Sequence, residues 1–332
     1  MPNFEIRPLD ESEYSLWDNF VEESPNGTIF HKTFWIRDSG RKFIIYGYFK
    51  GGELYAGIPL TYINKLGIKI ASQPILIPYL GVIFKKQDTK YVNRLTQEKE
   101  MSREIARRLK MDFYIVSFSS CPGLADFQPF LWEGFSAEVN YTYIINLENS
   151  LDDIWKAMDD RARNIIRKAE KDGICVVMSD DFNQTLNLVE KTLARQDMST
   201  IFKLTAMNYN DLLRARGQCK SFFAKDKKGD YIAVVYIVWD SKRSYYLLGG
   251  YDAERSHIGA SSIAVWEAIK YTKENLGLRE FDFEGSLISQ VELFFRKFGG
   301  MLTPYYNIKW VKPYLNPTGL LWKLGRFILS RL

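Results

Sequence analysis

The sequence predicts a mixed α/β (α+β) fold of two tandem domains, each with a mixed, largely antiparallel sheet flanked by helices. Length is the first observation, because 332 residues, 46% of them hydrophobic, fit two domains of ordinary size better than one. Repetition is the second observation. Segments 43–60 and 222–237 each combine an apolar strand, a glycine turn and a strand that resumes with a small residue, which is the pattern of a β-hairpin.

The elements around the two hairpins alternate without a run of parallel βαβ units, and this order favours mixed sheets with helices on both faces. In the first half we expect helices at 11–20 and 90–110 and strands at 113–118 and 141–145. In the second half we expect helices at 151–171, 182–195 and 260–275 and a strand at 279–283. The domains are therefore predicted at 1–148 and 149–312, followed by a tail at 313–332.

Charge and cysteine content narrow the class of protein. A formal net charge of +5 permits an anionic ligand but is too mild to indicate a nucleic-acid-binding domain. The three widely spaced cysteines, Cys121, Cys175 and Cys219, indicate reduced thiols rather than a disulfide framework or a zinc site. The polar N-terminus lacks a signal-peptide pattern, and the longest apolar run, 75–84, is too short to span a bilayer. We therefore expect a cytoplasmic protein.

The second half is predicted to open with an amphipathic helix at 151–171. Ser150 is the expected N-cap, and Gly173 supplies a left-handed stop. Apolar residues recur at spacings of three and four, as they do on one face of a helix. The segment also carries a dense set of basic residues, namely Arg161, Arg163, Arg167, Lys168 and Lys171. Two interpretations remain open for this set: a solvated helix face, or a contact to phosphate or to an acidic substrate.

A second candidate region follows the strand at 244–252, which ends at a pair of glycines. The segment Gly259-Ala-Ser261-Ser262 then begins a helix, and small residues there leave the first backbone amides open to anionic or polar ligand groups. A serine cap on a core helix is the alternative. Further on, the strand at 279–283 runs into a glycine turn that carries Glu284. This carboxylate is either a group that orients or deprotonates an attacking amine, or a turn acid.

These segments resemble the FemAB family, which comprises the Fem aminoacyltransferases and related GNAT-type proteins. The stretch from Arg161 to Ile174 is similar to the family signature R-x-x-I-R-K-A-x-K-x-G. Residues 266–269 read W-E-A-I, residues 282–285 match D-F-x-G, and residues 294–299 are similar to F-K-x-x-F-G. Residues 28–35 also look like the early F-Q-S-x-x-W segment, so the resemblance covers nearly the whole chain. It implies two tandem GNAT-like domains.

The resemblance also implies roles for individual residues. The implied catalytic residues are Glu284, Arg296 and Lys297, and the implied donor-binding residues are Gly259, Ser261 and Ser262. The implied substrate-binding residues line a basic and tyrosine-rich acceptor groove: Arg37, Arg41, Arg167, Arg195, Tyr245 and Tyr251. One departure stands out, because the family's lysine in F-K-x-x-F-G falls on Phe295, with Arg296 and Lys297 beside it.

The chemistry of acyl transfer agrees with the residue types present. The reaction needs a neutral amine close to the carbonyl and donors for the oxyanion, but no protein nucleophile when the amine attacks directly. The sequence has only His31 and His257 and no triad motif, metal-ligand cluster, Walker motif or Rossmann glycine motif. We expect no metal and no tightly bound cofactor. The co-substrate is either acyl-CoA or another acyl thioester, or an aminoacyl-tRNA.

The C-terminal tail has the pattern of a short amphipathic helix, with Leu320, Leu324 and Phe327 on one face and Lys323 and Arg326 elsewhere. Two roles are open for it: packing against the first domain, or peripheral binding to an anionic inner-membrane surface.

The function hypothesis is an acyltransferase that places an acyl or aminoacyl group on an amine of a cell-envelope precursor, such as one for peptidoglycan, or of a glycan. Its partners would be that acceptor and, for the tRNA donor, tRNA. The rival hypothesis is a non-catalytic scaffold with a degenerate double-GNAT fold, for which an altered motif residue such as Phe295 would be expected.

Overall fold

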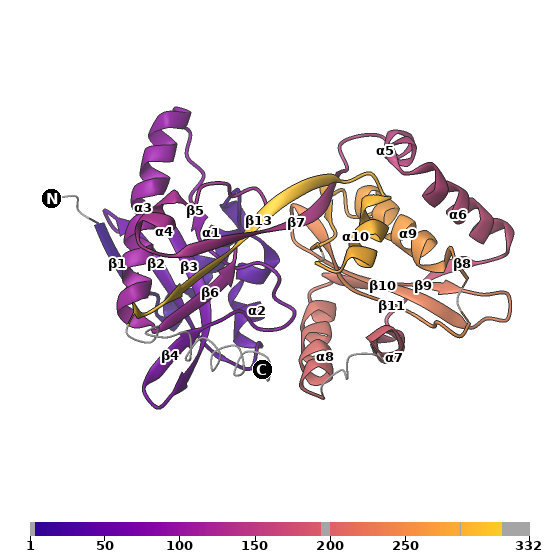
Figure 1. Ribbon diagram of the computed structural model, residues 1–332, viewed down its shortest axis with the longest axis horizontal. Coiled ribbons are helices and arrows are strands. Elements are labelled where there is room, and N and C mark those ends of the chain that lie inside the picture. The colour runs from indigo at the N-terminus through magenta and orange to yellow at the C-terminus, as the bar shows by residue number, and fades with distance from the viewer. Residues whose placement is uncertain (1–3, 194–199, 256, 286, 314–332) are drawn as a thin grey trace. The chain divides into compact units, whose positions relative to one another are not determined.

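The structure is a computed structural model of the chain, and it describes residues 4–193, 200–255, 257–285 and 287–313 (Figure 1). The chain divides into two compact units. Unit 1 holds the residues up to Asn140 and those from Pro304 onward, and unit 2 holds Tyr141–Thr303. The first division falls inside a strand that ends shortly before the predicted boundary at residue 148, and the chain returns to unit 1 after completing unit 2.

Unit 1 is built on a mixed sheet in the order β1-β2-β3-β4-β6-β13, with β5 paired to β3. Neighbouring strands are antiparallel except β4 and β6, which are parallel. The strands are β1 Phe4–Pro8, β2 Lys42–Lys50, β3 Glu53–Lys65, β4 Ile68–Ala71, β5 Ile83–Phe84, β6 Ile115–Ser119 and β13 Met301–Val311. The α-helices are α1 Tyr14–Glu23, α2 Thr33–Arg37, α3 Tyr91–Asp112 and α4 Gln128–Trp132.

The core of unit 1 depends on close contact between helix α1 and the sheet. Trp17 of α1 is completely buried, and its indole nitrogen donates a hydrogen bond of 2.7 Å to the carbonyl oxygen of His31. A Cβ atom on Gly57 of β3 would lie 2.5 Å from the Trp17 ring. Glycine at residue 57 therefore makes room for the largest side chain of this core, and any substitution there would push α1 away from β3.

Unit 2 is built on a sheet in the order β7-β12-β11-β10-β9-β8. Its strands are β7 Ser136–Asn146, β8 Cys175–Ser179, β9 Cys219–Lys225, β10 Tyr231–Trp239, β11 Arg243–Tyr251 and β12 Glu280–Asp282. All neighbours are antiparallel except β11 and β12, which are parallel. The helices are α5 Leu151–Ala157, α6 Asp160–Lys171, α7 Phe182–Leu193, α8 Thr200–Ala215, α9 Ala260–Glu274 and α10 Ser289–Arg296.

Helices cover both faces of the unit 2 sheet. Figure 1 shows α9, α6 and α10 on one face and α7 and α8 on the other. Helix α9 is apolar nearly all round, with nine buried residues, because it packs between the sheet and α6. The predicted fold class is thus confirmed, since the structure is a mixed, largely antiparallel α/β architecture with flanking helices.

The predicted hairpins form as β2–β3 and β9–β10. The single helix predicted at 151–171 is wrong, however, because α5 ends at Ala157 and α6 begins at Asp160. Asp159 caps α6 by accepting hydrogen bonds from the amides of Arg161 and Ala162 at 2.9 and 3.2 Å. Its own amide donates to the carbonyl oxygen of Lys297 at 2.9 Å, so a residue distant in sequence fixes the break.

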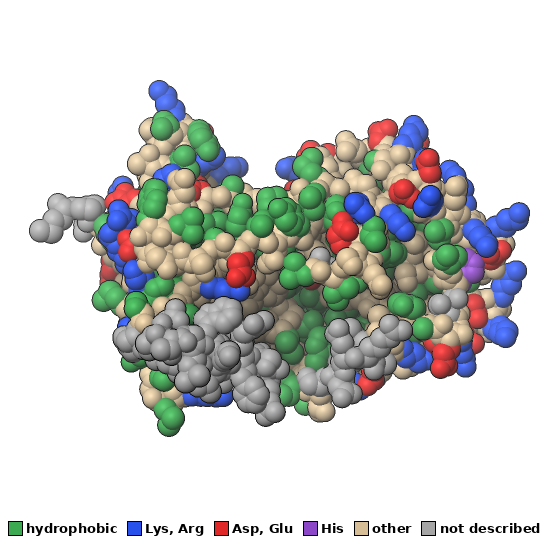
Figure 2. All heavy atoms as spheres, in the orientation of Figure 1, with side chains coloured by type: hydrophobic (Ala, Val, Ile, Leu, Met, Phe, Trp, Pro, Cys, Tyr) green, Lys and Arg blue, Asp and Glu red, His purple; other side chains and the backbone are tan. Residues whose placement is uncertain are grey.

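The surface charge and the described helices can be compared with the predictions, but part of the predicted tail cannot. On the face shown in Figure 2, acidic and basic side chains are interspersed over both units, in keeping with the mild net charge. Among the described helices, none is long and apolar enough to cross a membrane. The tail predicted at 313–332 lies outside the described residues from position 314 onward, as does Arg195.

Candidate active site

The candidate site lies at the carboxyl end of the parallel pair β11–β12. The two strands pair only over Arg243↔Glu280, Ser244↔Phe281 and Tyr245↔Asp282. Strand β11 then continues to Tyr251 with no described strand on its outer edge. Because the carboxyl ends of parallel strands point the same way, the turn after β12 and the loop from β11 to α9 lie at the same end of the sheet.

Glu284 is the acid in the turn that follows β12. Its φ angle of 58° is left-handed, which is uncommon for a residue with a Cβ atom. Its amide donates a 2.8 Å hydrogen bond to the Asp282 side chain, and the next residue, Gly285, is also left-handed at φ 80°. A Cβ atom on Gly285 would lie 2.1 Å from the carbonyl oxygen of Tyr141, so only glycine fits there. The turn is thus held in a strained conformation, as is common in active sites.

The carboxyl group of Glu284 is buried although the residue is part-exposed. Its Oε1 atom is shielded from solvent and has no hydrogen-bond partner among the described residues. Burial raises the pKa of Glu284 well above the usual value, and the negative charge of Asp282 raises it further. A buried polar atom without a partner costs stability, and a perturbed carboxyl group at a strand end is a typical feature of a functional site.

The Glu284 turn is fixed by hydrogen bonds and ion pairs that involve the buried residue Asp282. Asp282 is completely buried and accepts a 2.7 Å hydrogen bond from the hydroxyl of Thr142 on β7. Arg243 lies 3.5 Å from the Asp282 carboxylate and 2.6 Å from the Glu280 carboxylate. Asp282 is therefore partnered on several sides and fixes the backbone of Glu284 as a positioning residue.

Tyr245, a predicted substrate contact, has a buried partner of its own. It is completely buried, and its hydroxyl donates a 2.7 Å hydrogen bond to Asp240. Tyr251 at the end of β11 is 43% exposed, and its amide donates a 2.7 Å hydrogen bond to the hydroxyl of Thr192. Of these two predicted substrate contacts, Tyr251 is the one that presents its side chain to solvent.

The first turn of α9 carries the predicted donor-binding residues Gly259, Ser261 and Ser262. The amides of Gly259 and Ala260 donate to the ring and the carbonyl oxygen of His257 at 3.1 and 2.9 Å. No described residue accepts a hydrogen bond from the amides of Ser261 and Ser262, which lie at the positive end of a 15-residue helix. A Cβ atom on Gly259 would lie 2.7 Å from the carbonyl oxygen of Ile165, so α9 starts in direct contact with α6.

His257 holds this loop in place, a role that the sequence does not predict. Its Nδ1 accepts a hydrogen bond from Gly259, so the ring proton is on Nε2, which lies 3.0 Å from the carboxylate of Asp172 at the end of α6. The spacing His257-x-Gly259 is the only signal in the sequence, and the partner Asp172 lies too far along the chain to be inferred from it.

Four of the five basic residues of α6 are exposed, and the fifth, Arg163, is part-buried and pairs with Asp160. The Arg167 guanidinium lies 5.5 Å from the Trp155 ring and donates a 3.3 Å hydrogen bond to Asn164. Arg161, Lys168 and Lys171 are exposed, and none of them makes an ion pair with a described residue. Since α6 contacts the start of α9, these cations lie on a helix adjoining the open amides.

The F-K-x-x-F-G segment lies on α10 and the turn after it. Phe295, at the position of the family lysine, is 4% exposed and packs against Phe283 and Tyr246 with ring centroids 4.8 and 5.3 Å apart. Arg296 is exposed and lies 3.5 Å from the Glu292 carboxylate. Lys297 contributes its carbonyl oxygen to the cap of α6. Residue 295 is therefore part of the core, and the cations of this segment are Arg296 and Lys297.

The predicted residues of unit 1 have partners within that unit. Arg37 is exposed, lies 3.1 Å from Glu11 and stacks over Tyr14 at 5.7 Å. Arg41 is half-buried and donates hydrogen bonds to the carbonyl oxygen and the hydroxyl of Ser72 at 3.3 and 2.7 Å. Burial lowers the pKa of Arg41, but the guanidinium stays charged at neutral pH.

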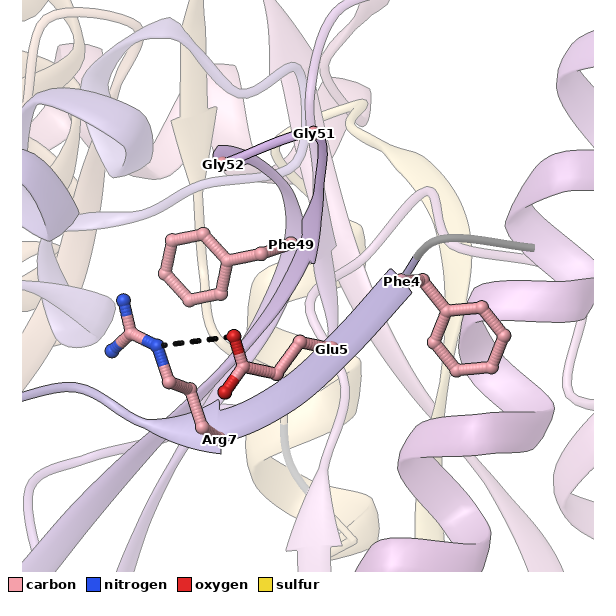
Figure 3. A pocket seen from close by; sticks show the side chains of 6 residues that line it. All are labelled: Phe4, Glu5, Arg7, Phe49, Gly51 and Gly52. Carbon is pink, nitrogen blue, oxygen red and sulfur yellow. Dashed lines mark ion pairs between the residues drawn. The ribbon is translucent and has the colours of Figure 1, made fainter. Parts of the chain in front are cut away.

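A pocket of about 230 Å³ lies elsewhere, beside the β2–β3 turn of unit 1 (Figure 3). Its lining includes Arg7, which makes two 2.7 Å hydrogen bonds to Glu13 and lies 4.2 Å from the Phe49 ring. The hydrogen bond from Arg7 lowers the pKa of Glu13 to about 2. Because these groups satisfy one another, the pocket offers no free polar group for catalysis, and Glu284 remains the stronger candidate.

Comparison with known proteins agrees with the geometry. Residues 157–287 match the acetyltransferase (GNAT) domain family, a range that includes α6, β11, α9 and Glu284. FemX has the same fold, with a TM-score of 0.67 and 17% identity over 91% of this chain and 96% of FemX. L-PGS from Bacillus licheniformis gives a TM-score of 0.58 and 13% identity over 98% of both chains. A tandem GNAT protein from the clavulanic acid biosynthesis pathway gives a TM-score of 0.51 and 10% identity over 92% of this chain and 98% of that protein.

No curated protein sequence matches the chain. The solved structures and the domain match together show a FemAB-like, GNAT-type fold, as the motifs predicted.

Proposed function

We propose that this protein is an acyltransferase that transfers an acyl or aminoacyl group to an amine of a cell-envelope precursor or a glycan. The buried Oε1 atom of Glu284, which has no hydrogen-bond partner among the described residues and lies at the carboxyl end of β11–β12, is the observation that carries the proposal. The GNAT match over residues 157–287 supports the reaction class. The likeness in fold to FemX, and to a structure titled as a lysylphosphatidylglycerol synthetase domain, supports the acceptor class.

The edge of β11 that has no described neighbouring strand is the proposed binding site for the acyl donor. Residues 246–250 extend for about 16 Å, since a strand rises about 3.3 Å per residue, and this suits an extended acyl arm. A β-bulge opposite Tyr236 and Ile237 bends β11 at this point. The open amides of Ser261 and Ser262 would bind an anionic group of the donor at the far end of that arm. The basic face of α6 would add long-range attraction for the same charge.

Glu284 is the proposed acid–base group. In its ionised form it takes the proton from the attacking amine, whose nitrogen forms a bond to the donor carbonyl carbon. The tetrahedral intermediate then collapses, and the bond to the thiolate sulfur or the tRNA ribose oxygen breaks. The protonated Glu284 returns its proton to that leaving group, so the carboxyl group is regenerated. A pKa raised by burial and by the charge of Asp282 suits a group that both accepts and donates a proton.

Thermal denaturation with acetyl-CoA, with charged tRNA and with neither tests the donor. A ligand that binds only the folded protein raises its melting temperature. At a ligand concentration one hundred times the Kd, the free energy of unfolding increases by about 2.7 kcal/mol. We expect one of the two donors to give such a shift. The matched control is Gly259→Val, whose side chain would collide with Ile165 and displace the first turn of α9. An equal shift in this variant would place the donor elsewhere.

A scaffold function is the second candidate, because the position of the family lysine is occupied by the buried Phe295. A scaffold does not require a left-handed turn with a buried carboxyl oxygen that lacks a partner, and such an atom costs stability. Absence of transfer by the wild-type protein with either donor would favour the scaffold, whereas undiminished transfer by Glu284→Gln would show that the site assignment is wrong.

A further inference from the structure

The tip of the β3–β4 hairpin in unit 1 carries an apolar residue where the fold favours a polar one. The turn has two residues, Leu66 and Gly67, because Lys65 pairs with Ile68. Both have left-handed φ angles, 52° and 81°. Turns of this kind strongly prefer Asn-Gly, since asparagine tolerates the left-handed region and its side chain is hydrated. Leucine is unfavourable on both counts, and its side chain is fully exposed, at 102% of the reference area.

The apolar surface extends along one face of the same hairpin. Ile63 lies opposite Ile70, and Ile68 lies opposite Lys65, so all four side chains are on one face. The three isoleucines are part-exposed. With Leu66 they form a surface that we call the hairpin tip, comprising Ile63, Leu66, Ile68 and Ile70. Figure 1 shows this hairpin extending beyond the neighbouring strands of unit 1.

The charge around the hairpin tip has one sign. Between Glu53 and Asp88 the sequence contains no acidic residue. Lys65 and Lys69 flank the tip, both are exposed, and neither makes an ion pair with a described residue. Another cation lies close by, because Tyr114 links Lys69 to Lys312 through backbone hydrogen bonds of 2.9 Å on each side.

Asp112, the acid at the end of helix α3, makes no ion pair with Lys65 or Lys69. Asp112 at the end of α3 accepts hydrogen bonds from Arg108 and Tyr46 at 2.7 and 2.5 Å. An exposed leucine flanked by Lys65 and Lys69 is complementary to an anionic bilayer, where the apolar tip enters the acyl region and the lysines meet the lipid phosphates.

We propose that the β3–β4 hairpin is a membrane contact, in which Leu66 inserts into an anionic lipid surface and Lys65 and Lys69 bind its headgroups. A second protein is a poorer fit, because a tip of four apolar residues is far smaller than the roughly 800 Å² per partner of a stable protein interface. A bilayer requires no such area, and a single apolar insertion supported by cations gives weak, reversible binding.

The test is flotation of the whole protein with vesicles of phosphatidylcholine alone and of equimolar phosphatidylcholine and phosphatidylglycerol. We expect binding to the anionic vesicles only, weakened by salt because exposed charges are screened. Leu66→Asn should lower the affinity about tenfold, the value of one inserted leucine side chain. The Lys65→Gln/Lys69→Gln double variant should lower it about twenty-fivefold, at roughly fivefold for each lysine.

The variants carry their own folding control. Leu66→Asn creates the preferred Asn-Gly turn, so its melting temperature should equal or exceed that of the wild type. Leu131→Asn replaces an exposed leucine on α4, and Lys50→Gln replaces an exposed lysine at the end of β2, the strand that pairs with β3. Both should bind like the wild type.

Three results would overturn the proposal: no binding to anionic vesicles, equal binding to neutral vesicles, or binding that Leu66→Asn and the double lysine variant leave unchanged. Self-association that Leu66→Asn abolishes, without vesicle binding, would assign the hairpin tip to a second copy of the chain instead.

Discussion

Replacing Glu284 by glutamine is expected to lower kcat/KM for acyl transfer by about 10²- to 10⁴-fold, the usual contribution of a general acid–base group. Glutamine has nearly the same shape and fits the same buried space, but it cannot accept or return a proton. Transfer from the donor identified by thermal denaturation to an amine acceptor gives the measurement. Glu138→Gln, which changes an exposed acid in unit 1, is the matched control and should retain full activity.

The pH dependence of the same rate gives an independent check. The amine proton can be taken only by ionised Glu284, and its pKa is raised by burial and by Asp282. The acidic limb of kcat/KM should therefore lie above the ordinary glutamate value of about 4.3, with activity rising as pH rises through the raised pKa. The residual activity of Glu284→Gln should lack this limb. A limb at the ordinary glutamate value in the wild type would contradict the assignment.

Replacing Phe295 by lysine, the residue that the FemAB motif has there, is expected to destabilise the protein by about 3–5 kcal/mol. The substitution removes aromatic contacts with Phe283 and Tyr246 and leaves an ammonium group in the core. Glu292, the acid on the same helix, already accepts a 2.5 Å hydrogen bond from Tyr143 and lies near Arg296.

Urea denaturation of the Phe295→Lys variant at neutral pH measures this loss. Phe295→Leu keeps the position apolar and should lose less stability than Phe295→Lys. Wild-type stability in the lysine variant would mean that residue 295 reaches solvent, and the family lysine would then fit this chain without rearrangement.

The sequence was sufficient for those features that depend on local chemistry. The two hairpins follow from strand–glycine–strand patterns, and both form. Ser150 caps α5 as predicted, with its hydroxyl accepting a 3.1 Å hydrogen bond from the amide of Asp153. Gly173 is left-handed at φ 78°, as a helix stop requires. Each of these signals is contained within a few neighbouring residues.

The break between α5 and α6 depends on distant residues, and the sequence did not reveal it. The apolar stripe runs through the break, since Ile154, Met158 and Ala162 all belong to one buried cluster. The hydrogen bond from Asp159 to Lys297 fixes the break, and it joins residues that only the folded chain brings together. A continuous stripe therefore predicts which residues are buried more reliably than it predicts one unbroken helix.

In the candidate site, too, local signals could be predicted from the sequence and contacts between distant residues could not. Glu284 was identified because it follows a strand and precedes a glycine. The lack of a partner for its Oε1 atom among the described residues depends on how β7, β12 and the turn pack, which no spacing encodes. Asp282 and His257 act through partners on other elements, Thr142 on β7 and Asp172 on α6. Positioning residues of this kind become recognisable only when the folded neighbours are known.

The central claim is that Glu284 is a buried carboxyl group that keeps its proton well above the pH at which an exposed glutamate loses it. The direct test is infrared difference spectroscopy of the free protein at pH values above the ordinary glutamate pKa of about 4.3, comparing the wild type with Glu284→Gln. We expect the C=O stretching band of a protonated carboxylic acid in the wild type, absent from the variant. If the wild type instead shows a carboxylate band that the variant lacks, and no protonated-acid band, Glu284 is ionised like an exposed acid. That result would contradict the proposed acid–base role.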